Sequence, residues 1–274
     1  MWAMKQTGSG LATAVALIAT IVVSTAAASQ EPPYQPQLNQ PGKDVQWVPT
    51  PPALVEKMLD LSGLTRDDRL VDLGSGDGVL VIAAARRGAR ARGIEYDARL
   101  VEYAKRAARE AGVERLTRFV RGDIFETDFS DATVVTTFLL PSMNLQLLPR
   151  FLAMKPGTRI VANTFAIGAW EPDATATIEP CERWCKAMLW IVPAHAAGTW
   201  RTPKGLLVLT QKYQVVSGSL GGEPVTNGRL KGTEISFTVG ATTYSGRVDD
   251  YRIRFRASGD DKAVEGRLQP APPR

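Results

Sequence analysis

A short apolar strand pattern that runs directly into a glycine-rich turn and then into an apolar helix is the feature that most constrains this chain. Residues 69–73 read Arg-Leu-Val-Asp-Leu, residues 74–78 read Gly-Ser-Gly-Asp-Gly, and residues 79–87 continue with apolar, helix-forming side chains. Glycines let the backbone adopt positive φ and approach a ligand closely. A strand, a glycine-rich turn and a helix in this order are typical of the first unit of a nucleotide-binding α/β sheet.

Strand and helix patterns alternate after this unit, and one more amphipathic helix is expected ahead of it at residues 50–63. The expected strands are 91–96, 118–121, 133–140 and 159–165, and the expected helices are 98–111 and 145–154. Strands that alternate with helices of this length imply a parallel sheet with right-handed crossovers. We therefore predict an α/β domain over residues 45–180, built on a Rossmann-like, doubly wound, mostly parallel sheet.

The pattern changes after about residue 180, where no convincing helix remains. Gly-Arg-Leu at 228–230 recurs as Gly-Arg-Val at 246–248 and again as Gly-Arg-Leu at 266–268. This spacing suits pairs of short antiparallel strands with their turns. We predict a β-rich C-terminal module over residues 187–270, an antiparallel β-meander or small open barrel, and the strand pattern at 206–216 fits either sheet.

The N-terminus has the layout of a secretory signal peptide, with a basic start, an apolar run at 11–23 and small residues after it. The apolar run is shorter than the ~20 residues of a spanning helix, and Ala26 and Ala28 give the small-x-small pattern of a cleavage site. We expect residues 1–28 to be a signal peptide or an anchor, with a buried helix as the alternative, and a linker at 29–44. Use of the signal would place the chain in the periplasm or cell envelope, and otherwise it stays cytoplasmic.

Composition narrows the possible chemistry. One histidine and two cysteines among 274 residues exclude a zinc site built from several imidazoles and a disulfide framework. We expect His195 to be structural or superficial rather than catalytic. The formal net charge is +5, and the whole excess follows residue 200, where there are 12 basic and 7 acidic residues. Arg252, Arg254 and Arg256 therefore form either a solvated basic face or a contact for anionic lipid or an acidic partner.

Acidic residues surround the glycine-rich turn. Asp72 ends the strand and Asp77 lies within the turn, although a diphosphate cofactor disfavours extra negative charge there. Glu95 ends the next strand, 19 residues beyond Gly76, where a carboxylate can take both ribose hydroxyls, and Asp123 follows the third strand. The set suits a ligand with a sulfonium and an ammonium group. It resembles the first motifs of the class I, seven-stranded S-adenosylmethionine-dependent methyltransferases.

Within that superfamily the chain resembles the protein-lysine methyltransferases of the ATP synthase c-subunit and the adenine nucleotide translocase, with their bacterial relatives. The likeness covers residues 47–170. It rests on Val-Pro-Thr-Pro at 48–51, on the run from Asp72 to Gly78, and on Leu-Leu-Pro at 139–141. Val79-Leu80 stands where that group usually has an arginine. The resemblance implies S-adenosyl-L-methionine as cofactor and a protein with an accessible lysine as partner.

The resemblance and the strand ends together assign the site. The expected cofactor-binding residues are Thr50, Asp72, Gly74, Ser75, Gly76, Asp77, Gly78, Glu95, Tyr96, Asp123, Ile124, Leu139 and Leu140. The expected catalytic residues are Phe138, Pro141 and Asn144, with Trp47 and Trp170 as further candidates for the acceptor channel, and no metal is expected. Phe-Leu-Leu-Pro at 138–141 lacks the pattern of adenine-N6 methyltransferases, so we expect no nucleic-acid partner.

Several interpretations stay open at this point. Cys181 and Cys185 form a disulfide, remain free thiols, or join a metal site. We expect Trp184, Trp190 and Trp200 to pack between the two modules. An exported, non-catalytic binding protein on the same scaffold is the main alternative function, because S-adenosylmethionine is made in the cytoplasm. Methylation of a small molecule or lipid is a further one, and membrane association is expected through the N-terminal segment or the basic module.

Overall fold

A computed structural model describes residues 1–4, 8 and 34–269 of the chain. The expected signal peptide or anchor, its cleavage after Ala28 and the start of the linker lie almost wholly outside the described residues. The chain divides into two units, Met1–Pro33 and Tyr34–Arg274, and every helix and strand that the structure describes lies in the second. In the described part of the chain, no helix has the length and apolar character needed to cross a bilayer.

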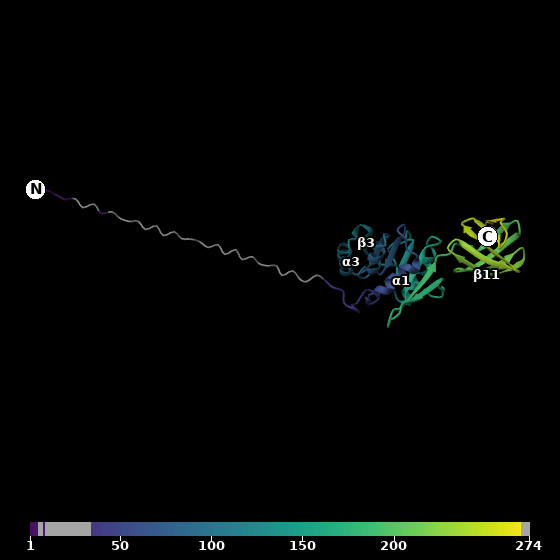
Figure 1. Cartoon of the computed structure of the whole chain (residues 1–274), viewed down its shortest axis with the longest axis horizontal. Coiled ribbons are helices and arrows are strands. Elements are labelled where there is room, and N and C mark those ends of the chain that lie inside the picture. Colours follow the sequence, from purple (N-terminus) through teal and green to yellow (C-terminus); the bar gives the residue numbers. More distant parts are fainter. Residues whose placement is uncertain (5–7, 9–33, 270–274) are drawn as a thin grey trace. The chain divides into compact units, whose positions relative to one another are not determined.

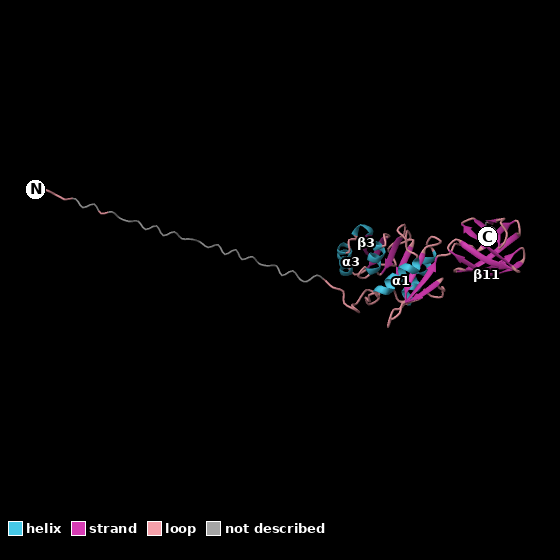
Figure 2. Ribbon diagram, in the orientation of Figure 1, coloured by secondary structure: helices cyan, strands magenta, loops and turns pink. Residues whose placement is uncertain are grey.

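Residues 52–191 form an α/β unit (Figures 1 and 2). Its helices are α1 (Pro52–Ser62), α2 (Val79–Arg86), α3 (Ala98–Glu110) and α4 (Pro141–Leu152), with a 3₁₀ turn at Glu114–Leu116. Its strands are β1 (Arg69–Leu73), β2 (Arg90–Glu95), β3 (Thr117–Arg121), β4 (Val134–Thr137), β5 (Arg159–Asn163), β6 (Ala174–Thr177) and β7 (Lys186–Ile191). The sheet order is β3-β2-β1-β4-β5-β7-β6, in which β7 pairs antiparallel with β5 and β6 and the other pairs are parallel. The predicted doubly wound, mostly parallel sheet is confirmed.

Neighbouring residues of the central strands point to opposite faces of this sheet and enter two separate apolar cores. Val134 and Val161 pack in the core that holds α1, α2 and α3. Val135 and Ile160, one position away in each strand, pack in the core that holds α4. Both faces are therefore covered, and the strand ends are the part of the sheet left for a ligand.

The strand β4 and the helix α4 meet at Pro141, which corrects two expected boundaries. The expected strand 133–140 ends at Thr137, and the expected helix 145–154 begins four residues earlier, at Pro141. Proline fits the first position of a helix because its fixed φ is helical and its missing N–H has no partner there. Residues 138–140 therefore leave the sheet and turn toward the helix.

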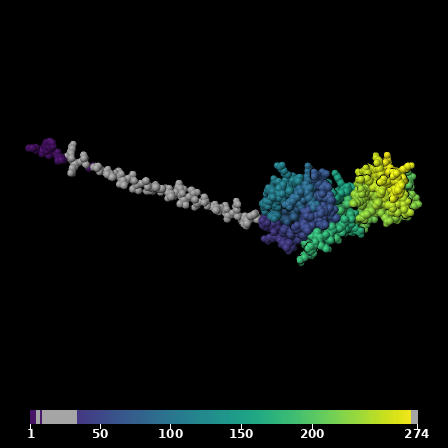
Figure 3. Space-filling view, in the orientation of Figure 1, coloured from purple at the N-terminus to yellow at the C-terminus, as the bar shows by residue number. Residues whose placement is uncertain are grey.

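Residues 198–268 form a closed barrel of eight antiparallel strands, coloured green to yellow in Figure 3. The strands are β8 (Gly198–Thr202), β9 (Gly205–Lys212), β10 (Val215–Leu220), β11 (Glu223–Lys231), β12 (Glu234–Val239), β13 (Thr242–Asp249), β14 (Arg252–Ala257) and β15 (Val264–Leu268). Pairing of β15 with β8 closes the predicted meander. The three Gly-Arg repeats lie in β11, β13 and β15, one in each successive hairpin.

Inward side chains of the barrel form a core of their own. Phe237, Tyr244 and Phe255 contact one another there with ring centroids 5.3 to 5.6 Å apart. The segment at 206–216, which fitted either sheet, is split by a turn at residues 213–214 into β9 and β10 and belongs to the barrel.

The α/β sheet extends beyond the boundary expected at residue 180. Strand β7 pairs with β5 from Ile191 opposite Arg159 to Ala187 opposite Asn163, so the expected start of the second module at 187 falls inside the first sheet. The apolar run at 187–190 signals a buried strand, but nothing in the run specifies which sheet it joins.

The expectation that three tryptophans pack between the modules is wrong for two of them. Trp190 is buried in the α/β core, where its Nε1 donates to the carbonyl oxygen of Trp170 at 2.7 Å. Trp200 is buried inside the barrel, where its Nε1 donates to the carbonyl oxygen of Ala196 at 2.9 Å. A buried indole needs an acceptor for its N–H, and each ring finds one within its own core. Trp184 lies beside Phe138 at the sheet edge.

Candidate functional site

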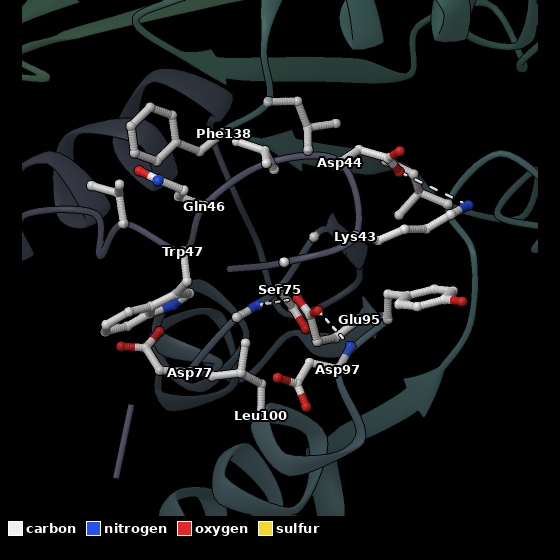
Figure 4. A pocket seen from close by; sticks show the side chains of 18 of the residues that line it. Lys43, Asp44, Gln46, Trp47, Ser75, Asp77, Glu95, Asp97, Leu100 and Phe138 are labelled. Atoms are coloured by element: carbon white, nitrogen blue, oxygen red, sulfur yellow. Dashed lines mark hydrogen bonds and ion pairs between the residues drawn. The ribbon is translucent and has the colours of Figure 1, made fainter. Parts of the chain in front are cut away.

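A pocket lies outside the carboxyl ends of β1, β2 and β4, around the glycine-rich turn (Figure 4). The sequence-predicted residues that line it are Thr50, Asp72, Gly74, Ser75, Gly76, Asp77, Glu95, Tyr96, Asp123, Ile124, Phe138 and Leu139. Trp47, a candidate for the acceptor channel, lines it as well. Ligands bind at this edge of open α/β sheets because the loops there converge.

Four predicted residues lie outside the pocket lining. Leu140 and Pro141 are exposed at the start of α4. Gly78 has φ +83°, and a Cβ there would lie 2.7 Å from the Phe119 ring, so this glycine serves the packing of α2. Asn144 is buried and its Nδ2 donates to the carbonyl oxygen of Phe165 at 3.2 Å, which holds the loop after β5.

Two further candidates are placed away from the pocket. Trp170, a candidate for the acceptor channel, is 1% exposed and packs within the α/β core. His195 is exposed between β7 and β8, in keeping with the structural or surface role expected for it.

The pocket is lined by residues that sequence reasoning missed. These are Gln40, Pro41, Gly42, Lys43, Asp44, Val45, Gln46, Val48, Pro49, Val79, Leu80, Asp97, Leu100, Gly122 and Met143. Most belong to residues 40–49, which the sequence assigned to a linker and a domain start. The sequence of this stretch gives little indication of a binding role, because it has no regular periodicity and reaches the pocket only through loop contacts.

Glu95 is fixed at the end of β2 by two backbone donors. Its Oε2 accepts from the Gly76 amide at 2.9 Å, and its Oε1 accepts from the Asp97 amide at 2.9 Å. Each carboxylate oxygen can accept a second hydrogen bond, so Glu95 is oriented and still available to hydroxyl groups.

Buried acids give the pocket a negative character. Burial, opposed by a 2.7 Å hydrogen bond from Thr136, raises the pKa of Asp72 to about 7, with Asp77 and Glu95 adding repulsion. Burial also raises the pKa of Asp77. The lining contains six acidic side chains and one lysine, an arrangement that favours a cationic ligand.

Two buried polar atoms of the pocket, the Ser75 hydroxyl and Nε2 of Gln40, lack a protein partner. The hydroxyl of Ser75 makes no hydrogen bond, although the residue is only 4% exposed. Leaving such a group unpaired costs about 1–3 kcal/mol. A polar ligand in the pocket would satisfy it, so the residues present fit a nucleoside carrying a positive charge.

Residues 39–47 form a loop across the pocket. The Asn39 amide donates to the Trp47 carbonyl at 3.0 Å, and the Trp47 amide returns a 3.0 Å hydrogen bond to Gln40. From this loop the Lys43 ammonium donates to Asp123 at 2.5 Å, which holds the pKa of that carboxyl below its usual range. Figure 4 shows Lys43 and Trp47 at the same pocket as Glu95.

The two cysteines form a disulfide in the loop between β6 and β7, which decides among the three alternatives left by the sequence. Within residues 1–4, 8 and 34–269, no cluster of three histidine, cysteine or acidic side chains is arranged to hold a metal ion.

Comparisons with known proteins agree with this geometry. A family model described as the ANTKMT methyltransferase domain matches residues 72–174. A protein-lysine N-methyltransferase of Saccharolobus islandicus is 36% identical over 154 residues, which are 55% of this chain and 96% of that protein. The mouse lysine N-methyltransferase of the ATP synthase c-subunit is 36% identical over 131 residues, which are 47% of this chain and 53% of that protein.

A solved structure gives the same fold with a ligand. It is described as an RNA methyltransferase from Salinibacter ruber in complex with S-adenosyl-L-homocysteine. It is 47% identical with a TM-score of 0.52, and the match covers 54% of this chain and 96% of that one.

Proposed function

We propose, because this chain belongs to the ANTKMT-type family of class I S-adenosylmethionine-dependent methyltransferases, that it methylates the side-chain amine of a lysine in a protein. The chain is an enzyme of this family, and its cofactor is S-adenosyl-L-methionine. The observation that carries the lysine assignment is an acid-lined cofactor pocket that ends in an apolar strand end at Phe138. The names of the archaeal and animal relatives support it.

Each of three acidic residues of the pocket would bind a different part of the cofactor. Glu95 is oriented for the ribose hydroxyls, Asp123 for the adenine amino group, and Asp72 for the ammonium group. When bound, S-adenosylmethionine supplies an electrophilic methyl carbon, to which the amine nitrogen bonds as the carbon–sulfur bond breaks and its electron pair stays on sulfur. The protein's part is alignment and exclusion of water.

The acceptor end of the pocket favours an uncharged amine. Phe138, Leu139 and Met143 are apolar and line the pocket beside α4. A lysine has a reference pKa of ~10.4, and an apolar surrounding lowers it because burial disfavours the charged form. The proton leaves to solvent before methyl transfer, and the product of the transfer is a methylammonium group.

The proposal is tested with tritium-labelled cofactor and a lysate from a strain that lacks the gene. Label is expected in protein, and acid hydrolysis followed by amino-acid analysis should recover it as methyllysine. Label in RNA instead, the acceptor that the name of the Salinibacter protein suggests for that protein, would contradict the lysine assignment. Label in the organic-solvent fraction would favour a lipid or small molecule.

Replacing Lys43 by alanine is expected to tighten binding of S-adenosylmethionine. Lys43 neutralises the carboxylate of Asp123 and adds a positive charge beside a site for a cationic ligand. Because the pair is exposed, the gain should not exceed about fivefold in dissociation constant. Calorimetry checks it, and added salt, which screens the charge of Lys43, should reduce the difference between the two proteins. Weaker binding by the variant would contradict this prediction.

Export is a separate proposal, supported by the signal-like N-terminus and by the Cys181–Cys185 disulfide, since disulfides persist in oxidising compartments. Mass spectrometry of the mature N-terminus in each cell fraction tests it. An intact N-terminus in the cytoplasmic fraction would refute it.

Association with an anionic membrane surface is proposed for the barrel. Arg252 lies directly opposite Arg267. Arg247 lies opposite Arg254, which is itself paired with Glu265 at 3.1 Å. Like charges in such positions destabilise a sheet, and an anionic surface relieves the repulsion. Salt-sensitive pelleting with phosphatidylglycerol vesicles should be lost in an Arg252→Gln, Arg267→Gln variant. Equal pelleting of both proteins would refute the proposal.

A further inference from the structure

Three aromatic side chains meet beside the pocket where β4, β5 and β7 have neighbouring ends. Phe138 follows β4, Phe165 follows β5, and Trp184 precedes β7. Because β7 runs antiparallel to β5, its first residues lie next to the last residues of β5, with Ala187 opposite Asn163. The fold thus gathers at one edge three rings that are far apart in the sequence.

The rings pack on one another and remain partly exposed. Their centroids are 5.4 Å apart for Phe138 and Trp184, 5.7 Å for Phe165 and Trp184, and 6.3 Å for Phe138 and Phe165. These separations are favourable for aromatic pairs. All three side chains are half-buried, and Phe138 also lines the cofactor pocket. An aromatic surface therefore continues outward from the acceptor end of the pocket.

Two local constraints hold the surface in place. Trp184 lies inside the loop that the Cys181–Cys185 disulfide closes, and its backbone has φ +59°. A bulky residue adopts this left-handed conformation only where the surrounding structure holds it there. Asn144, buried in α4, donates to the carbonyl oxygen of Phe165 and holds the backbone that carries the second ring.

We infer that Phe138, Phe165 and Trp184 form an aromatic platform that receives the acceptor side chain, and that Trp184 determines specificity for a long aliphatic amine. The inference rests on the proposed function and names the residues that select its substrate. The methylenes of a lysine can pack along the rings and exclude water from the amine. A short polar side chain leaves the rings in water and gains nothing from them.

The test measures binding of Nα-acetyl-lysine methylamide to enzyme loaded with S-adenosylhomocysteine, by saturation-transfer NMR to the lysine methylenes. Trp184→Ala should weaken binding about five- to tenfold, whereas Trp184→Phe should retain most of it. Replacing both Cys181 and Cys185 by serine should weaken binding in the wild type but add nothing to Trp184→Ala. Tyr251→Ala, which removes a 75% exposed aromatic residue of the barrel, is the matched control.

Measuring the cofactor affinity of Trp184→Ala shows whether the variant has lost acceptor binding alone or its folded structure. Trp184 does not line the cofactor pocket, so Trp184→Ala should bind S-adenosylmethionine as the wild type does. Loss of both affinities, no change in probe binding, or no probe binding by the wild type would each overturn the platform. A wild type that binds the probe but methylates no protein lysine overturns the proposed function alone. Methylation with an unchanged KM in Trp184→Ala overturns the platform alone.

Discussion

Replacing Gly76 by arginine is expected to abolish cofactor binding, which we define as a dissociation constant raised more than about a hundredfold. Gly76 has φ +52°, and a Cβ there would lie 2.5 Å from Nε1 of Trp47. A longer side chain enters the pocket, displaces the loop that carries Trp47, and disturbs the amide that orients Glu95. Isothermal titration with S-adenosylmethionine measures the loss.

Gly112→Arg is the matched control for this variant. Gly112 has φ +70°, so arginine there meets the same left-handed backbone, but no atom lies within 4 Å of its Cβ position. The control should lose stability of the order of 1–2 kcal/mol and keep its cofactor affinity. If a folded Gly76→Arg protein bound the cofactor with the same heat as the wild type, the glycine-rich turn would not be part of the cofactor site.

The part of the site that could be predicted from the sequence consists of residues whose role depends on the local backbone alone. The turn around Gly76 needs positive φ, and the acid at Glu95 follows a strand of recognisable pattern, so sequence alone located both. The residues missed on the loop at 39–47 reach the pocket through a few hydrogen bonds and one ion pair. Such contacts carry no periodicity, and only the folded chain reveals them.

Two sequence-based predictions of the fold are wrong for the same reason. Each concerns which part of the protein an apolar segment packs against. The sequence places the start of the second module at residue 187, yet the strand there pairs with β5, at the space left at that edge of the sheet. Trp190 and Trp200 are expected between the modules. Each instead finds an acceptor for its N–H inside its own core.

Cofactor affinity is expected to increase with pH between about 5.5 and 7, by close to tenfold for each pH unit well below 7, because Asp72 must ionise to receive the cofactor's ammonium group. Burial raises the pKa of this carboxyl to about 7, so it is mostly protonated at pH 6 in the free protein. The cofactor's own α-amino group has a pKa of about 7.7–8.0 and stays charged over this range. Binding at pH 6 should therefore release about one proton, seen as a dependence of the calorimetric enthalpy on the buffer.

The same shift predicts how the stability of the free protein depends on pH. Because the folded pKa of Asp72 lies above its unfolded value, the contribution of this residue to folding stability is fully present below pH 4 and is lost as pH rises to about 7, a change on the order of 4 kcal/mol at most.

Two variants test both pH predictions. Asp72→Asn should remove the proton release on binding and also the part of the pH dependence of unfolding that comes from Asp72. Thr136→Val removes the hydrogen bond that lowers the pKa, so it should move the affinity profile to higher pH. An affinity independent of pH in the wild type would mean that Asp72 is already ionised in the free pocket, or that the ammonium group is held elsewhere.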